Sequence, residues 1–271
     1  MSWNLNNILG LDVITVDSWN AQGIVAAFST RRGGISARPF DTLNLGLHVG
    51  DAQDVVLSNR ESYVNIFALH LDMLVCCEQV HGSEVIRVSQ ADRGRGARMH
   101  SQALPGADAM ISDTPGLFMM ALYADCIPVY FFDPRKRAVG LAHSGWKGTM
   151  AQIAVNTIRA MHDEFGSMPE DMNLFIGPGI GSCCFAIQAD LAERVRRDFR
   201  HLSDILYTDG DGGCKWDLKE TNRQLLVNCG VKAENITVCD LCTACNPQLF
   251  YSYRRDKGRT GRMGALLGIR G

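Results

Sequence analysis

The length, composition and charge of the chain are those of a folded protein of enzyme size. It has 271 residues, of which 46% are hydrophobic and 21% are charged, and its formal net charge is −2. A chain of this length buries a full core without disulfides or metals to hold it together. Its sequence pI of about 6.4 argues against general nucleic-acid binding, which needs a basic surface to displace counterions.

Neither a secretory signal nor a membrane span is predicted. Residues 1–7 are polar and lack the charged-then-apolar layout of a signal peptide. The most apolar part of the chain, residues 117–132, is interrupted by Asp125, and each half is too short to cross a bilayer. We therefore expect a cytoplasmic protein, in which the ten cysteines are buried side chains, metal ligands or nucleophiles rather than disulfides.

The hydrophobic pattern predicts a mixed α/β fold in a single domain over residues 1–271. The predicted elements, in chain order, are strand 24–29, helix 54–69, strands 74–79, 84–88, 109–112, 117–123, 127–133 and 138–143, helix 149–165, strand 173–176, helices 190–202 and 217–229, and strand 236–240. Asp217, followed three residues later by Glu220, is typical of a helix start. A charged turn is expected at 134–137 and a polar loop at 209–213. Strands and helices do not alternate strictly, so a Rossmann sheet is not predicted.

Three potential metal ligands each follow a predicted strand and stand close to a glycine or proline. They are His81, Cys126 and His143. A side chain at a strand end is both fixed and accessible. Two imidazoles and one thiolate suit a zinc site with a fourth position left open, and the thiolate would also accept copper. Their wide separation in sequence leaves simpler interpretations open: histidines satisfied at turns, and a cysteine buried as an apolar side chain.

Several further motifs occur in a fixed order along residues 28–262. They are FSTRRGGIS at 28–36, NLGLHVGD at 44–51, QVHG at 79–82, GADA at 106–109, ADCIP at 124–128, HSGWKG at 143–148, IGPGIG at 176–181 with Cys183 and Cys184, and FYSYRRD at 250–256 with TGR at 260–262. In this order they resemble the YfiH-like family, also known as the polyphenol oxidase or laccase-domain family and as a purine nucleoside phosphorylase family. Ser144 departs from the alanine that many relatives carry, a change that should not disturb a metal.

The resemblance implies a fold, a cofactor and an activity. The implied fold is a single-domain mixed-sheet sandwich of the YfiH/toxin-deamidase type. The implied zinc ligands are His81, Cys126 and His143. The implied enzyme is cytoplasmic, phosphorolyses adenosine, inosine or methylthioadenosine, and deaminates adenosine. Its partners would then be a small nucleoside and phosphate, with no nucleic acid or membrane involved.

Four further residues are candidates for the active site, each with a structural alternative. Arg31 is expected to bind phosphate through its two-pronged guanidinium, or else to stabilise a turn. Asn44 would contact a ribose or base, or cap a turn. His48 would line the cleft or donate a proton, or be satisfied within a loop. Asp125 would orient a ligand or move a proton as a catalytic group, or cap a helix.

Two other functions remain open from the sequence. Cys126 activated by His143 or His81 would make an amide hydrolase, of the kind that edits misincorporated amino acids in peptidoglycan precursors. A non-enzymatic metal-binding partner protein would keep the same residues. A laccase is not favoured, because one three-ligand site cannot supply the several coppers that oxygen reduction requires. The run of Cys239, Cys242 and Cys245 shows no fourth ligand nearby in the sequence and gives only a weak signal for a second metal.

Overall fold

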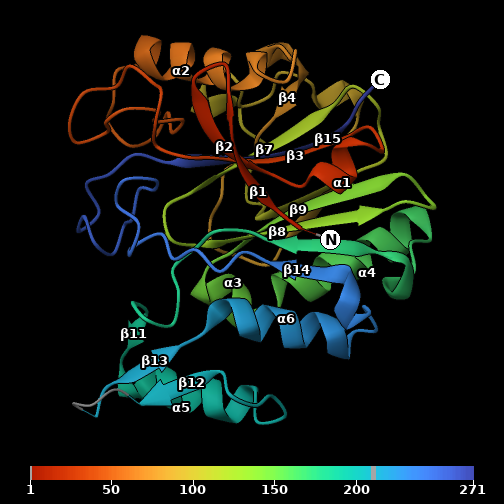
Figure 1. Cartoon of the computed structure of the whole chain (residues 1–271). Coiled ribbons are helices and arrows are strands. Elements are labelled where there is room, and N and C mark those ends of the chain that lie inside the picture. The colour runs from red at the N-terminus through yellow and green to blue at the C-terminus, as the bar shows by residue number, and fades with distance from the viewer. Residues whose placement is uncertain (1, 209–211) are drawn as a thin grey trace.

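The computed structural model describes residues 2–208 and 212–271, and two six-stranded sheets stacked face to face form its centre (Figure 1). The first sheet has the strand order β1-β2-β3-β15-β7-β4. The bounds of these strands, in that order, are Asn4–Ile8, Leu11–Thr15, Ile24–Ser29, Met263–Ile269, Phe118–Tyr123 and Leu74–Val75. β15, close to the C-terminus, therefore lies in the middle of the sheet, antiparallel to both β3 and β7.

The second sheet has the order β14-β10-β8-β9-β6-β5. Its strands, in that order, are Ile236–Val238, Asn173–Ile176, Ile127–Asp133, Ala138–Ser144, Ala109–Ser112 and Val85–Arg87. A small third sheet has the order β11-β13-β12, with bounds Ala186–Ile187, Cys214–Trp216 and Leu206–Thr208. It lies at the bottom of Figure 1, away from the two large sheets.

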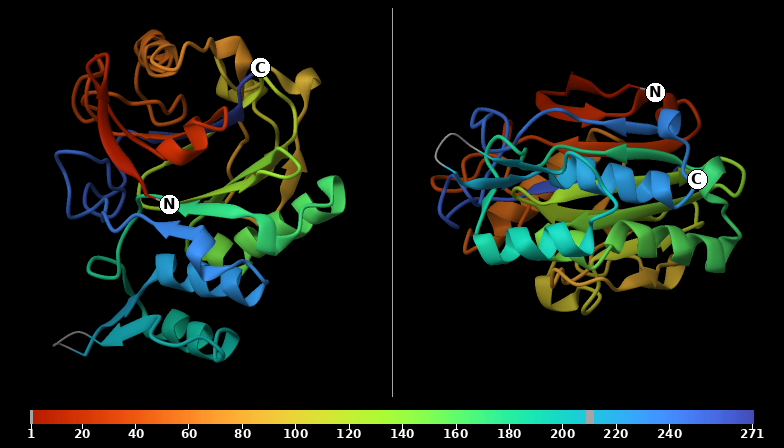
Figure 2. Two further views of the ribbon diagram at one scale, coloured as in Figure 1. Left: turned by 45° about the vertical axis from the view of Figure 1, so that its right-hand side comes forward. Right: turned by 90° about the horizontal axis from the view of Figure 1, so that it is seen from below.

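Helices cover the outer faces of both large sheets. The α-helices are α1 Asp17–Asn20, α2 Gln53–Asn65, α3 Trp146–Met150, α4 Ile153–Phe165, α5 Ala189–Asp198 and α6 Leu218–Asn228. Short 3-10 turns lie at Leu71–Met73, Gln90–Asp92, His100–Gln102, Pro169–Asp171 and Ala233–Asn235. α2 lies on the outer side of the first sheet, while α4, α5 and α6 lie on the outer side of the second (Figures 1 and 2). No helix of the described residues is long and apolar enough to span a membrane.

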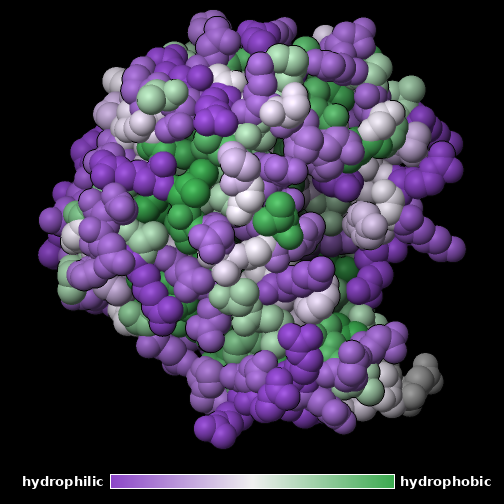
Figure 3. Space-filling view, turned by 180° about the vertical axis from the view of Figure 1, so that it is seen from behind, coloured by the Kyte–Doolittle hydropathy of each residue, from purple (hydrophilic) through white to green (hydrophobic). Residues whose placement is uncertain are grey.

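The core explains why the strands read as continuous apolar runs. Side chains from both sheets meet between them; Phe28 of β3 and Tyr130 of β8 are fully buried there, and the Tyr130 hydroxyl donates to the Ala27 carbonyl at 2.8 Å. Alternate residues of β3, such as Val25, pack on the other face against the α2 layer. Because both faces of the central strands are covered, both sets of their alternating side chains are largely apolar. The outer surface differs: hydrophilic residues predominate on the face in Figure 3, with hydrophobic patches between them.

The expected mixed α/β fold is confirmed, with corrections at several elements. β3, β6, β8 and β10 have the predicted bounds, and the turn at 134–137 joins β8 to β9. The predicted strand 74–79 is wrong beyond Val75, because the chain leaves the sheet there. The predicted helix 149–165 is two helices, separated at Gln152, whose φ is +55°. Of the loop predicted at 209–213, residues 209–211 lie outside the described part of the chain.

β15 is the most important element that the hydrophobic pattern missed. Its two glycines, Gly264 and Gly268, weaken the strand signal in the sequence. In the structure they allow close packing: a Cβ at Gly268 would lie 2.4 Å from Cδ1 of Phe118 on the neighbouring strand. β1, β2 and the small third sheet were also missed. β1 and β2 pair as a local antiparallel hairpin, but β1 contains three asparagines and is largely exposed, and the strands of the third sheet are only two or three residues long.

The predicted start of α6 provides a test of local stability. Oδ1 of Asp217 accepts from the backbone N–H of Glu220 at 2.9 Å, which satisfies a donor that the first turn of the helix leaves open. Asp217→Ala should lower the free energy of unfolding by about 1 kcal/mol. Urea denaturation should show a lower midpoint with an unchanged m value. Asp217→Asn, which keeps the acceptor, should lose much less, and equal losses would contradict a capping role.

Candidate active site

His81, Cys126 and His143 meet at one point, although 62 residues separate the first from the last. Their ligand atoms all lie within 4.8 Å of one another, and the two imidazole ring centroids are 4.9 Å apart. Of the three, His143 is buried, Cys126 is partly exposed and His81 is exposed. The structure therefore brings together all three residues that the sequence analysis proposed as metal ligands.

The path of the chain between the two sheets creates this meeting point. β7 belongs to the first sheet and β8 to the second, so the chain crosses between them at residues 124–126. Asp125, in the middle of the crossing, has φ +92°. His143 is on β9, paired with β8 opposite Pro128. His81 comes from the loop after β4 and also has a left-handed backbone, with φ +60°.

Asp108 holds two of these three residues in place. Its fully buried carboxylate accepts from Nδ1 of His143 at 2.8 Å. The same carboxylate accepts from the backbone N–H groups of Val80, His81 and Gly82 at 3.1, 3.0 and 2.6 Å. With Nδ1 engaged, His143 presents Nε2 to the cluster. A carboxylate behind a histidine is a common arrangement around protein metal sites.

The three groups strongly influence one another's protonation. Burial raises the pKa of Cys126, but His143 and His81 outweigh burial and bring that pKa down to about 6. Burial lowers the pKa of His143, but Cys126 and Asp108 outweigh it and raise that pKa to about 9. Between these values a thiolate faces an imidazolium. A thiolate is the form of cysteine that both binds metals and acts as a nucleophile.

Gly145 leaves the space that the cluster needs. A Cβ at this position would lie 2.7 Å from Sγ of Cys126 and 3.4 Å from Cδ2 of His81. Glycine therefore lets the backbone at the start of α3 approach the thiol side of the cluster. The soft and borderline donors, their spacing and this clearance together fit a single metal ion.

The cluster opens into a cavity of about 570 Å³. Its wall includes three cations, Lys147, Arg254 and Arg262, and the aromatic side chains Tyr253 and Phe185. The Arg254 guanidinium lies 5.0 Å from the Phe185 ring centroid, and that of Arg262 lies 5.9 Å from the Tyr253 centroid. A concave wall with both cations and apolar rings suits an anionic group joined to a flat organic one.

The four other predicted site residues take different positions. His48 lines the cavity beside His100, with ring centroids 5.0 Å apart. Burial, then Arg262 and other nearby positive groups, lower the pKa of His48 to about 4, so it is uncharged near pH 7. Asn44 is fully buried; its Oδ1 accepts from the N–H groups of Gly46 and Arg262 at 3.0 and 2.9 Å. Asn44 therefore holds the backbone that presents Arg262.

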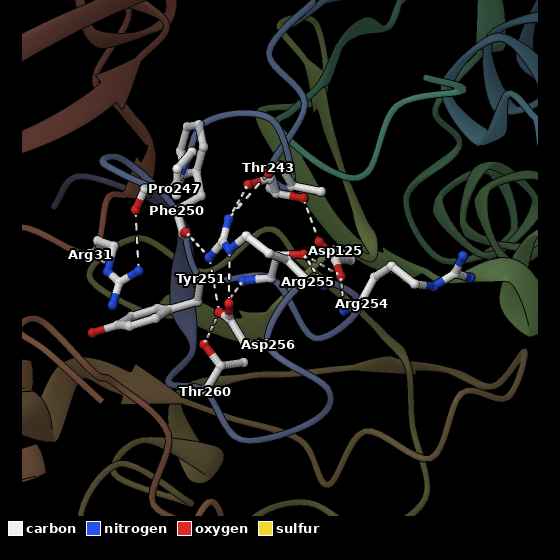
Figure 4. A network of polar contacts seen from close by, with 12 residues as sticks. Arg31, Asp125, Thr243, Pro247, Phe250, Tyr251, Arg254, Arg255, Asp256 and Thr260 are labelled. Atoms are coloured by element: carbon white, nitrogen blue, oxygen red, sulfur yellow. Dashed lines mark hydrogen bonds and ion pairs between the residues drawn. The ribbon is translucent and has the colours of Figure 1, made fainter. Parts of the chain in front are cut away.

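Arg31 is not among the residues that line the cavity. Its Nε donates to the Asp41 carbonyl at 2.8 Å, Nη2 pairs with the Asp41 carboxylate at 3.2 Å, and Nη1 donates to the Pro247 carbonyl at 3.2 Å. The guanidinium also lies 4.7 Å from the Tyr251 ring centroid, and Figure 4 shows it turned toward Pro247 and Tyr251. These contacts join distant segments; a phosphate contact by Arg31 stays a prediction.

Asp125 lines the cavity, but both of its carboxylate oxygens bind the C-terminal segment (Figure 4). Oδ1 accepts from the Thr243 hydroxyl at 2.6 Å; Oδ2 accepts from the Ser252 hydroxyl at 2.9 Å and from the Arg254 N–H at 2.7 Å. This arrangement supports the cavity wall next to Cys126. A proton-transfer role for Asp125 stays a prediction.

Asp108, Lys147 and Arg262 were not predicted from the sequence as site residues. Asp108 lies within the quoted GADA motif, and Lys147 and Arg262 lie within HSGWKG and TGR. The sequence therefore held a signal for all three residues, because each belongs to one of the motifs that resemble the family. Which motif members face the cavity depends on how distant segments pack, which spacing along the chain does not reveal.

Comparisons with known proteins agree with this architecture. The sequence model of a family described as multi-copper polyphenol oxidoreductase laccase matches residues 25–270. The chain is 40% identical over 249 residues to "Purine nucleoside phosphorylase YlmD" of Geobacillus stearothermophilus, covering 92% of this chain and 91% of that protein. It is 34% identical over 255 residues to "Purine nucleoside phosphorylase YfiH" of Escherichia coli, covering 94% and 98%.

Solved structures show the same fold. A crystal structure of YlmD from Geobacillus stearothermophilus superimposes with a TM-score of 0.93 at 38% identity, covering 98% of both chains. That of the Bacillus licheniformis hypothetical protein YfiH gives a TM-score of 0.92 at 38% identity, covering 99% of both. The stacked sheets and the His-Cys-His cluster thus define a mixed α/β protein of the YfiH type. The chain belongs to this laccase-like YfiH family.

The position of Asp108 predicts an effect on metal affinity. Asp108→Asn keeps the shape but weakens the acceptor that orients His143 and the 80–82 backbone. Affinity for zinc should fall by about 10- to 100-fold, measured by competition with a chromophoric chelator. Asp113→Asn, at an exposed aspartate paired with Arg87, is the matched control and should leave affinity unchanged. An unchanged affinity in Asp108→Asn would remove this role.

The protonation of Cys126 predicts a pH profile. In chelator-treated protein, alkylation at the Cys126 peptide should increase as the pH rises through about 6, because only the thiolate reacts. His143→Asn removes the main favourable charge, so the midpoint should move up by about 1–3 pH units. Peptide mapping by mass spectrometry separates Cys126 from the other cysteines. An identical profile in both proteins would show that His143 does not stabilise the thiolate.

Proposed function

We propose that the chain is a zinc-dependent purine nucleoside phosphorylase that acts on adenosine, inosine or methylthioadenosine and also deaminates adenosine. The observation that carries the proposal is the His81–Cys126–His143 cluster at the wall of a cavity that also holds three cations. The names of relatives from Geobacillus stearothermophilus and Escherichia coli, both purine nucleoside phosphorylases, support the phosphorylase part of the proposal.

The metal site would be formed by the two imidazoles and the thiolate. Zinc on three protein ligands keeps a position for water or substrate and lowers the pKa of a bound water, which suits deamination. Asp108 fixes the tautomer of His143, and Gly145 leaves room beside Cys126. Laccase activity is not part of the proposal, since this cluster offers ligands for one ion and multi-copper chemistry needs several.

The cavity wall would bind the two substrates of phosphorolysis. Lys147, Arg254 and Arg262 supply positive charge for phosphate, and arginine offers paired donors that match its oxygens. Tyr253 and Phe185 offer flat apolar surface to a purine. The uncharged His48 can donate one hydrogen bond and accept another from a ribose or base. Holding phosphate against the anomeric carbon lowers the barrier mainly by orientation.

The direct test is nucleoside turnover by purified protein. Ribose 1-phosphate should form from inosine or adenosine only when phosphate is present, and inosine should form from adenosine without it. Treatment with a chelator should abolish both reactions, and added zinc should restore them. Turnover of no nucleoside by zinc-loaded, folded protein would overturn the proposal and favour a non-enzymatic metal-binding role.

Two arginines give a matched comparison for phosphate binding. Arg262→Lys should raise KM for phosphate about tenfold or more, because a point charge replaces a two-pronged donor. Arg31 lies outside the cavity wall and joins distant segments of the chain. If that is its whole role, Arg31→Lys should change the KM for phosphate by less than about twofold. Adenosine deamination needs no phosphate and serves as the internal control. A larger effect in Arg31→Lys would return phosphate binding to Arg31.

A second candidate function rests on a specific observation at the same site. Cys126, His143 and Asp108 form a chain of nucleophile, base and orienting carboxylate, the arrangement of cysteine hydrolases. Such an enzyme would cleave amides, with peptidoglycan precursors as the candidate substrates. Its activity should survive chelation and disappear on alkylation of Cys126, the opposite of the metal dependence expected above.

A further inference from the structure

A second group of potential metal ligands lies outside the proposed active site. It consists of Cys183, Cys184, Cys242 and Cys245, whose sulfur atoms all lie within 4.8 Å of one another. Sγ of Cys245 lies 3.5 Å from that of Cys183 and 3.3 Å from that of Cys184. Two chain segments, about 60 residues apart, therefore each contribute two thiols to one point.

These distances suit a single tetrahedral ion. Four thiolates around zinc, each about 2.3 Å from the metal, place neighbouring sulfurs about 3.8 Å apart. All four cysteines are free, and the sulfur separations of 3.5 and 3.3 Å are far longer than the roughly 2.05 Å of a disulfide. A four-iron cluster spreads its cysteine sulfurs more widely, because each binds a different iron. Four sulfurs within 4.8 Å of one another therefore favour a single ion, and four-cysteine sites of this kind are typical of structural zinc.

The Cys242–Cys245 turn is shaped to hold thiolates. The backbone N–H of Gly181 donates to Sγ of Cys242 at 3.2 Å, and the N–H groups of Ala244 and Cys245 also point to this sulfur. Backbone donors directed at a sulfur support a metal-bound thiolate in the way that outer hydrogen bonds support other ligands.

The same turn is fixed from its other side. Nη1 of Arg255 donates to the carbonyls of Thr243 and Ala244 at 3.0 and 3.4 Å (Figure 4). The Thr243 N–H donates to the Gly179 carbonyl at 3.1 Å, and its hydroxyl donates to Asp125. The turn is thereby held before any metal binds, which reduces the entropy that binding must overcome.

We propose that Cys183, Cys184, Cys242 and Cys245 form a structural zinc site that joins the 177–185 loop to the C-terminal segment. Cys239, the first cysteine of the Cys-x2-Cys-x2-Cys run, is not a ligand: it is fully buried in the core between the sheets, and its N–H donates to the Ile176 carbonyl. The run therefore supplies two ligands, Cys242 and Cys245. The other two come from Cys183 and Cys184, which are distant in sequence.

This site would hold two parts of the active-site wall together. Phe185 follows the first cysteine pair directly, and Arg254 lies nine residues after Cys245; both line the cavity. The inference rests on the cysteine geometry and not on the proposed phosphorylase activity. Loss of this zinc should loosen both segments, so limited proteolysis within 177–185 or 241–254 should become at least about tenfold faster.

Metal analysis distinguishes the two sites. Purified wild-type protein should contain two zinc equivalents, whereas the double variant His81→Ala/His143→Ala should keep one and Cys184→Ala/Cys245→Ala should keep the other. Cys229→Ser, at a partly buried cysteine on the C-terminal end of α6, and Cys239→Ala are the matched controls and should keep both. The proposal would be overturned if wild-type protein held a single zinc equivalent that only the histidine variant lost. That result would leave the proposed metal site at His81, Cys126 and His143 intact.

Cobalt substitution keeps the test informative even if the cysteine variants do not fold. In the His81→Ala/His143→Ala background, one bound Co²⁺ should show the intense sulfur-to-metal absorption of four thiolates. Adding zinc should bleach this spectrum. Failure of this folded variant to bind cobalt or zinc would overturn the site. A titration in denaturant finding fewer than the ten thiols of the chain, with Cys245 in a disulfide, would also overturn it.

Discussion

One buried carboxylate, that of Asp108, decides the geometry on which the proposed chemistry depends. Burying a charge is costly unless it is paired and hydrogen-bonded. Here the four donors from His143 and the backbone of residues 80–82 satisfy it, and they come from two separate parts of the site. The left-handed backbone of His81 is held by the same contacts. The Asp108 carboxylate thus sets the positions of the two histidines, the tautomer of His143 and the charge next to the cluster.

The crossing between the sheets decides where the cavity lies. Since β7 and β8 belong to different sheets, Cys126 is carried out of both and faces the space beside them. Asp125 then ties that crossing to Thr243 and Arg254. In a similar way, Asn44 accepts from the backbone N–H of Arg262 and holds that segment in place. Several of the polar residues around the cavity therefore act on its frame, and a smaller set of cations and rings remains for ligands.

The same three side chains suit two kinds of chemistry, and the physical reason is the thiolate. His143 and His81 lower the pKa of Cys126 to about 6, and the resulting thiolate is both a good metal ligand and a good nucleophile. A bound metal would use up that reactivity by sharing its lone pair. The neighbouring cations favour an anionic ligand, and the phosphate that the proposed phosphorolysis requires is such an anion.

The sequence by itself determined the strands with unbroken apolar runs, such as β8, the helix start at Asp217, and the identity of the three ligand candidates. These follow from local pattern and from residue type. Only the tertiary structure decided that glycine-containing β15 is a central strand, that Asp108 orients His143, and that Arg262 rather than Arg31 reaches the cavity. The tertiary structure also brought Cys183 and Cys184 next to Cys242 and Cys245. Each of these depends on contacts between segments far apart in the chain, and local spacing carries no record of them.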